Sequence, residues 1–246
     1  VKVPRQLQLN DGRLFLRERR PYIDKVIEQS RVLDVPVHSM IRLGRSISDA
    51  ILKTVQENKS DVALFGWPGS TGSRDQMFGS VIDRIASNPP TDIAILRHRP
   101  YEELQSILVP VAGGPNSRLA VSLAIALARN TPESTKVVLL HISLSRTNPK
   151  GAEARAQNAF RRATEGRRYE LIEKRILTSD SPAAGILEVS EDCDMIVIGA
   201  TKERLFRNIL VGNVSEQIAD RAHCPVLIVK RRSTMVASML RETVLS

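Results

Sequence analysis

One segment of the sequence has the residue types and spacing of an anion-binding loop. It runs from Gly66 to Ser80 and reads GWPGSTGSRDQMFGS, with glycines at Gly66, Gly69 and Gly79. Glycines permit a positive φ and let the backbone approach an anion, and a helix beginning after the loop offers unpaired N–H groups. We expect Ser80 to cap that helix and to donate to a phosphate oxygen. Because no Gly-Lys-Ser/Thr follows, the loop is not a Walker motif, and a tight strand-to-helix turn is the alternative.

Signals for catalysis or metal binding are weaker. No histidine has a cysteine or carboxylate at metal-ligand spacing, and no cysteine has a recognisable base beside it. We find no Ser-His-Asp arrangement, so catalysis is not indicated and a slow ATPase is the least supported hypothesis. Two cysteines are too few for a disulfide framework, which suits a reducing, cytosolic location. The residues are His38 and His141, expected within strands, His98 and His223, expected at strand borders, and Cys193 and Cys224.

The net charge of +9 comes from 36 basic and 27 acidic residues in a chain of 246. Aromatic residues are 4% of the chain, too sparse for a base-stacking platform, so we expect no nucleic-acid partner. Solvated helix faces are the favoured interpretation, and attraction to anionic lipid is the functional alternative. The chain has no apolar run of the roughly 18 residues needed to span a bilayer. The basic clusters lie at 13–20, 161–168, 202–207 and 230–232.

A repeat with an offset of 133 residues organises the chain. It aligns Asp61–Gly66 with Asp194–Gly199, and it continues without a gap to align Ile93–Arg97 with Val226–Lys230. A repeat this long indicates two copies of one domain rather than a solenoid, whose units are of the order of 20–50 residues.

Apolar runs alternate with amphipathic stretches in the second copy, as expected for a parallel sheet covered by helices on both faces. We therefore predict an α/β fold with two tandem open-sheet domains, each with a mostly parallel five-stranded sheet. In the second copy we expect strands at 106–111, 136–143, 170–177, 195–198 and 226–229, and helices from Ser117, over 152–168, from Pro182 and over 214–222.

The first copy repeats the later part of that order and lacks the opening strand and helix. Something of the order of thirty residues is therefore expected before Val1. Its expected elements are strands at 1–3, 35–41, 62–65 and 93–96, and helices over 21–33, 48–58 and after the glycine loop. The predicted organisation is a first domain over 1–98, a linker at 99–105, a second domain over 106–232 and a tail at 233–246.

The loop spacing Gly66-x2-Gly69-x9-Gly79-Ser80 resembles the nucleotide loop of the universal stress protein family. The second copy is similar to that family in Ile107–Val111, Asp194–Gly199 and Ala222–Val229. The resemblance covers nearly the whole chain and implies that the loop holds the phosphates of a nucleotide. It also implies that the end of the first strand of a domain holds the adenosine, and that the final strands pair.

The second copy departs from the family pattern, which puts its site in doubt. Lys202 stands in place of the second loop glycine, Asn213 replaces the hydroxyl residue, and Ala112 stands where ATP-binding relatives carry an aspartate. Trp67 is expected either to stack on a base or to pack over the sheet edge. The candidate binding residues are Gly66, Gly69, Ser70, Arg74, which would screen phosphate charge, Gly79 and Ser80, together with Gly199, Gly212 and Asn213.

The hypothesis that these features favour is a non-catalytic regulatory module that binds ATP, AMP or a cyclic dinucleotide, with Mg²⁺ only alongside the nucleotide. The Gly-Trp-x-Gly loop and the Val-x-Val-Pro-Arg start also resemble the C-terminal cytoplasmic regions of amino acid and cation–chloride transporters of the amino acid–polyamine–organocation superfamily. This resemblance implies a membrane-tethered domain on the cytoplasmic side, attached to a transporter. The alternatives are a nucleotide-free dimerisation scaffold and a free-standing tandem protein, and we expect the final strands to pair within the chain or in a homodimer.

Overall fold

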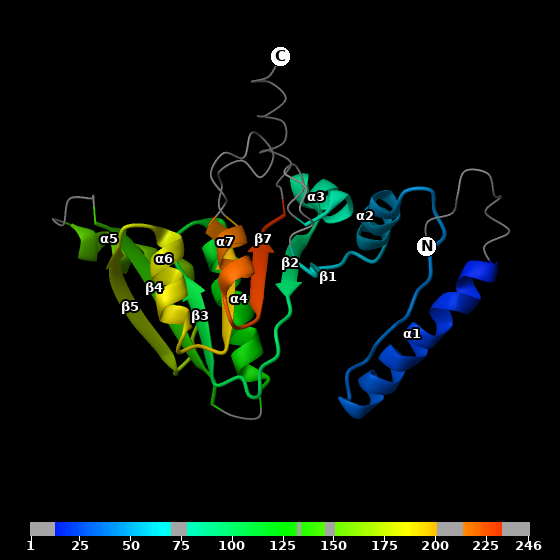
Figure 1. Ribbon diagram of the computed structural model, residues 1–246, viewed down its shortest axis with the longest axis horizontal. Helices are drawn as coiled ribbons and strands as arrows, with labels where there is room; N and C mark the ends of the chain where they lie inside the picture. The colour runs from blue at the N-terminus through cyan, green and yellow to red at the C-terminus, as the bar shows by residue number, and fades with distance from the viewer. Residues whose placement is uncertain (1–12, 70–77, 132–133, 146–150, 201–213, 233–246) are drawn as a thin grey trace, which may run out of the picture. The chain divides into compact units, whose positions relative to one another are not determined.

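A computed structural model describes residues 13–69, 78–131, 134–145, 151–200 and 214–232 (Figure 1). The chain divides into two compact units, Val1–Lys59 and Ser60–Ser246. Within the described residues, no helix is both long and apolar enough to cross a membrane. The expected strand at 1–3 and the tail at 233–246 lie outside the described residues.

The described part of the first unit, residues 13–59, contains two helices, α1 (Arg13–Val32) and α2 (Ile47–Glu57). The expected start of α1 at Pro21 is wrong, because Pro21 lies inside the helix. A proline there removes one backbone hydrogen bond but does not prevent the helix from continuing. The start of α2 is close to the prediction, and the Ser46 side chain caps it by accepting from the N–H of Asp49.

The strand expected at 35–41 is also wrong. Residues 35–43 have no regular secondary structure, and Val35, Val37 and Met40 are exposed. His38 therefore lies in an irregular segment rather than in a strand. A strand needs a neighbour to pair its backbone N–H and C=O groups, and the described part of this unit contains none.

The second unit is built on one seven-stranded sheet with the order β1-β2-β7-β6-β3-β4-β5. All neighbouring strands are parallel except β2 and β7, which are antiparallel. The predicted open α/β architecture is confirmed, but the strands form one continuous sheet rather than two sheets of five. The strands are β1 (Val62–Gly66), β2 (Asp92–Arg97), β3 (Ser106–Pro110), β4 (Lys136–Leu144), β5 (Ile172–Ser179), β6 (Met195–Gly199) and β7 (Val226–Lys230).

The join between β2 and β7 is the pairing of final strands that the family resemblance implies. In this register Ile93 lies opposite Lys230 and Arg97 lies opposite Val226. Intrachain pairing is thus confirmed, whereas a homodimer stays a prediction. Residues 99–105, the predicted linker, lead from β2 into β3 without a helix or strand.

Helices cover both faces of the part of the sheet that the second copy contributes. Helices α4 and α5 pack together against one face, and α6 and α7 pack together against the other (Figure 1). Helix α5 ends four residues before its expected end, because Gly166 adopts a φ of 73°. Pro182 begins α6, as predicted. The helices are α3 (Ser80–Ser87), α4 (Pro115–Arg129), α5 (Ala152–Thr164), α6 (Pro182–Ser190) and α7 (Val214–Arg221).

The core beneath α4 and α5 positions the carboxyl ends of the strands. Ile107 and Val109 of β3, Leu139 of β4 and Phe160 of α5 are completely buried. Each such side chain stabilises the fold by roughly 1.5–3 kcal/mol relative to an exposed position. β3 lies between β6 and β4 in the sheet. The connection that follows β3 leads to β4 on one side, whereas the connection that follows β6 leads to β7 on the other side. A crevice is therefore expected at the carboxyl ends of β3 and β6.

Candidate functional site

The glycine loop of the first copy lies between β1 and α3. Gly69 has a φ of 120° and Gly79 a φ of 91°, values that side chains rarely tolerate. Gly79, rather than Ser80, is the N-cap of α3, which corrects the expected capping role of Ser80. Among the described residues, no side chain caps the helix at Gly79.

The first turn of α3 presents backbone amides. The N–H groups of Ser80, Val81 and Ile82 have no acceptor within the helix, whereas a serine side chain caps each of α2 and α6. The N–H of Phe78 donates to the Asp83 carboxylate over 3.2 Å. This buried carboxylate offsets part of the positive helix dipole.

Trp67 is part of the packing rather than a platform for a base. Its side chain is 2% exposed. The indole meets the ring of Phe78 edge-on, with centroids 5.1 Å apart, and the guanidinium carbon of Arg97 lies 5.7 Å from the indole centroid. Of the two roles that the sequence left open for Trp67, the structure shows the packing role.

Arg97, at the end of β2, places a charged group beside the loop. Its guanidinium donates to the carbonyl of Pro68, and a Cβ on Gly69 would lie 2.7 Å from its Nη1. The Arg97 Nε and the Trp67 Nε1 are both buried and have no hydrogen-bond partner among the residues that the structure describes. A buried donor without an acceptor costs about 1–3 kcal/mol, so an acceptor supplied by a ligand would be favourable here.

Sequence reasoning missed Arg97, although a signal was present. The repeat aligns Arg97 with Lys230, so both copies end their last strand with a cation. The Lys230 ammonium instead donates to the Ala86 carbonyl at the end of α3, over 2.6 Å. The predicted residues Ser70 and Arg74 lie outside the described residues.

In the second copy, Asn116 joins the residues that follow β6 and β7. Its side-chain amide donates to the Ala200 carbonyl over 2.6 Å, and its Oδ1 accepts from the Arg231 N–H over 2.9 Å. A Cβ on Gly199 would lie 2.6 Å from the backbone carbon of Asn116. Gly199 is therefore required for close packing of α4 against β6, while the other predicted residues of this copy, Gly212 and Asn213, lie outside the described residues.

A cavity of about 350 Å³ lies at the opposite ends of the strands, and it includes Cys193, Asp194, His223 and Cys224. The Asp194 carboxylate accepts from the N–H and hydroxyl of Ser106 over 2.8 and 2.9 Å, so it is held in structural bonds. Burial raises the pKa of Cys224 to about 11, which makes it a poor nucleophile. No group of three metal-ligating side chains occurs among the described residues.

Comparison with known proteins gives the family. The model of the universal stress protein family matches residues 103–230, which is more than half of the chain. The chain belongs to the universal stress protein family. Among curated relatives, this universal stress protein is 25% identical to universal stress protein Rv2623 of Mycobacterium tuberculosis over 228 residues, covering 85% of the chain and 74% of the relative.

A membrane protein is also among the relatives of this universal stress protein. The chain is 24% identical to the Na(+)/H(+) antiporter NhaS5 of Synechocystis over 199 residues, covering 80% of the chain. The chain spans only 28% of the length of that antiporter. A universal stress protein from Archaeoglobus fulgidus superposes with a TM-score of 0.63 at 17% identity, covering 88% of this chain and 77% of the other, which shows a shared fold.

Proposed function

We propose that this universal stress protein is a non-catalytic regulatory module that binds the phosphates of an adenine nucleotide at the loop Gly66–Ser80. The observation that carries the proposal is the uncapped start of α3 behind two glycines with positive φ. Such amides favour an anion through their N–H groups and the helix dipole. The unsatisfied donors of Trp67 and Arg97 supply further hydrogen bonds for phosphate oxygens.

These groups suit a phosphate chain because every one of them is a donor. ATP, AMP and a cyclic dinucleotide all satisfy this requirement, with Mg²⁺ arriving only with the nucleotide. The adenine specificity rests on the family resemblance. In the second copy, the Asn116 side chain already bonds to the backbone after β6 and β7. We therefore propose that one nucleotide binds per chain, with Gly66, Gly69, Ser70, Arg74, Gly79 and Ser80 around its phosphates.

A dimerisation scaffold without nucleotide is the second candidate. The antiparallel pairing of β2 and β7 favours it, because this pairing joins the two copies through their backbones. The Arg97 contact with Pro68 also favours it, because the cation already has an acceptor in the loop.

We further propose that the protein consists of two tandem domains with a boundary at 99–105, and that it is cytoplasmic and attached to a membrane transporter. The antiporter relative supports attachment to a transporter. Assignment to the amino acid–polyamine–organocation superfamily stays a prediction from the sequence. In this arrangement a nucleotide would shift the transporter by its difference in affinity for two states.

Calorimetry separates these functions. ATP, AMP and cyclic di-AMP are titrated into the chain, into Gly79→Val and into Gly114→Ala. Gly79 requires a positive φ that valine disfavours, whereas Gly114, also an N-cap glycine, has a φ of −84° and open space for a Cβ. We expect one saturable site that Gly79→Val abolishes and Gly114→Ala retains.

Absence of binding to the unaltered chain would favour the scaffold. Equal binding by Gly79→Val and the unaltered chain would place any nucleotide elsewhere. Steady phosphate release that persists through repeated purification would contradict a non-catalytic module.

A further inference from the structure

Away from the glycine loop, positively charged side chains gather between α4 and residues 165–168, which follow α5. A cavity of about 210 Å³ is found there. Since a water molecule takes about 30 Å³ in the liquid, this cavity has room for a tetrahedral oxyanion. It is lined by Ser122, Ile125, Ala126 and Arg129 of α4 and by Gly166, Arg167 and Arg168.

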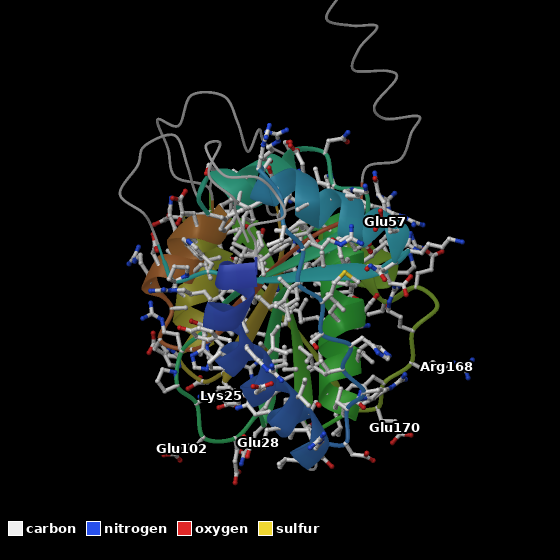
Figure 2. The ribbon with its side chains drawn as sticks, turned by 90° about the vertical axis from the view of Figure 1, so that its right-hand side faces the viewer. Lys25, Glu28, Glu57, Glu102, Arg168 and Glu170 are labelled. Carbon is white, nitrogen blue, oxygen red and sulfur yellow. The ribbon has the colours of Figure 1, made fainter. Side chains whose placement is uncertain are left out.

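The backbone holds the arginines in place. The positive φ of Gly166 turns the chain back toward α4, and the Arg167 N–H donates to the Thr164 carbonyl over 2.9 Å. From the other side, the Arg129 guanidinium donates to the carbonyl of Arg168. The side chain of Arg168 itself points outward from the surface (Figure 2).

Arg167 is positioned by two further hydrogen bonds. Its Nε donates to the Ser122 hydroxyl, and its Nη1 donates to the Glu165 carbonyl over 2.9 Å. The Ser122 hydroxyl in turn donates to the Arg118 carbonyl over 2.8 Å, which fixes its direction. The Nη2 of Arg167 has no hydrogen bond to any described residue, so one edge of a fixed guanidinium remains available.

The cluster has more positive than negative charge. Burial lowers the pKa of Arg167, and the charges of Arg118 and Arg231 lower it further. The Glu165 carboxylate lies 3.3 Å from the Arg118 guanidinium. Its negative charge acts in the opposite direction and raises the pKa of Arg167. Like charges in a partly buried place repel, and a bound anion would relieve that repulsion.

We propose that the cavity between α4 and residues 165–168 binds a phosphate group, with Arg129 and Arg167 as its charged donors and Ser122 positioning Arg167. Guanidinium groups suit this ligand because their planar donors match pairs of phosphate oxygens. The phosphate belongs either to a small soluble phosphate or to an anionic phospholipid headgroup. This site uses none of the residues of the nucleotide loop, so the two proposals stand or fall separately.

An NMR titration with inorganic phosphate tests the site, with the Nε–Hε signals of Arg129 and Arg167 as local reporters. We expect saturable shifts of both signals and at least about tenfold weaker binding in Arg167→Gln, since a hydrogen bond to a charged group is lost. Ser122→Ala should weaken binding less. Arg221→Gln removes the same charge from the exposed end of α7, on the other face, and should bind as the unaltered chain does.

Vesicles of phosphatidylcholine, with or without phosphatidic acid, distinguish the two sources. Binding that requires phosphatidic acid and the two arginines identifies a headgroup, and phosphate binding without vesicle binding identifies a soluble ligand. Arg167→Lys keeps the charge but loses the planar fork and should also bind weakly, with its thermal unfolding checked first. The proposal would be overturned by an equal loss of phosphate binding in Arg221→Gln. It would also be overturned by chemical-shift changes confined to the Gly79 amide, or by stronger binding to duplex DNA than to phosphate and vesicles.

Discussion

Ile95 of β2 lies directly opposite Ile228 of β7, and the two are the same position of the repeat, 133 residues apart. The same offset relates two other pairs of this join, in which Ile93 lies opposite Lys230 and Arg97 lies opposite Val226. In the repeat, Ile93 corresponds to Val226 and Arg97 corresponds to Lys230, so the offset converts one pair into the other. The antiparallel join therefore has the symmetry of a two-fold dimer interface within one chain. This relationship agrees with the offset of 133 residues found in the sequence repeat.

This pairing makes a prediction about stability. Ile95 and Ile228 are each 3% exposed, so Ile95→Ala and Ile228→Ala should each lower the free energy of unfolding by about 2–5 kcal/mol. Because the two residues are cross-strand neighbours, the double substitution should cost less than the sum. Urea denaturation measures this, with Ile176→Ala on the exposed edge strand as a near-neutral control. Strict additivity would show that the two side chains do not interact.

Equivalent glycines should respond differently to a methyl group. A Cβ on Gly199 would meet the Asn116 backbone at 2.6 Å, whereas a Cβ on Gly66 meets nothing within 4 Å. We expect Gly199→Ala to destabilise the fold by about 1–3 kcal/mol and Gly66→Ala to change it little. Thermal unfolding of both variants gives the comparison, and similar melting temperatures would contradict the close packing of α4 against β6 at Gly199.

Arg97 should matter for affinity if the glycine loop holds phosphates. Arg97→Gln removes the charge beside Gly69 and should weaken ATP binding about tenfold. Arg221→Gln changes the net charge equally and serves as the control in the same calorimetric titration. Tighter binding by Arg97→Gln would instead mean that Arg97 blocks the loop.

Glu216 should make stability depend on pH. Burial raises the pKa of this carboxyl, and Asp220 and Asp83 raise it further. The folded state therefore binds the Glu216 proton more tightly than the unfolded state does. The stabilisation that this proton gives is complete below the ordinary pKa of 4.5 and is lost as the pH rises through the raised pKa of the folded state. Glu216→Gln should therefore increase the melting temperature at pH 7 and change it little near pH 4.

Glu153→Gln, at an exposed position in the first turn of α5, is the control for the pH experiment. If Glu216→Gln raised the melting temperature equally at both pH values, the gain would come from the shape of the glutamine side chain rather than from the loss of charge.

Much of the second copy could be predicted from the sequence because its signals are local. The apolar runs at β3, β4, β6 and β7 are long enough to be strands, and Pro182 marks the start of α6. The positive φ values of Gly69 and Gly79 also follow from the glycine spacing. The strand expected at 35–41 failed because pairing depends on a neighbour, which no local pattern can supply.

By itself, the sequence determined the repeat, the α/β class, the family and the place of the glycine loop, because each depends on the order of residues along the chain. Only the tertiary structure decided that the strands form a single sheet, that Trp67 is buried against Phe78 and Arg97, and that Asn116 joins the ends of β6 and β7. These features depend on contacts between residues far apart in the chain, whose formation is set by packing rather than by local preference.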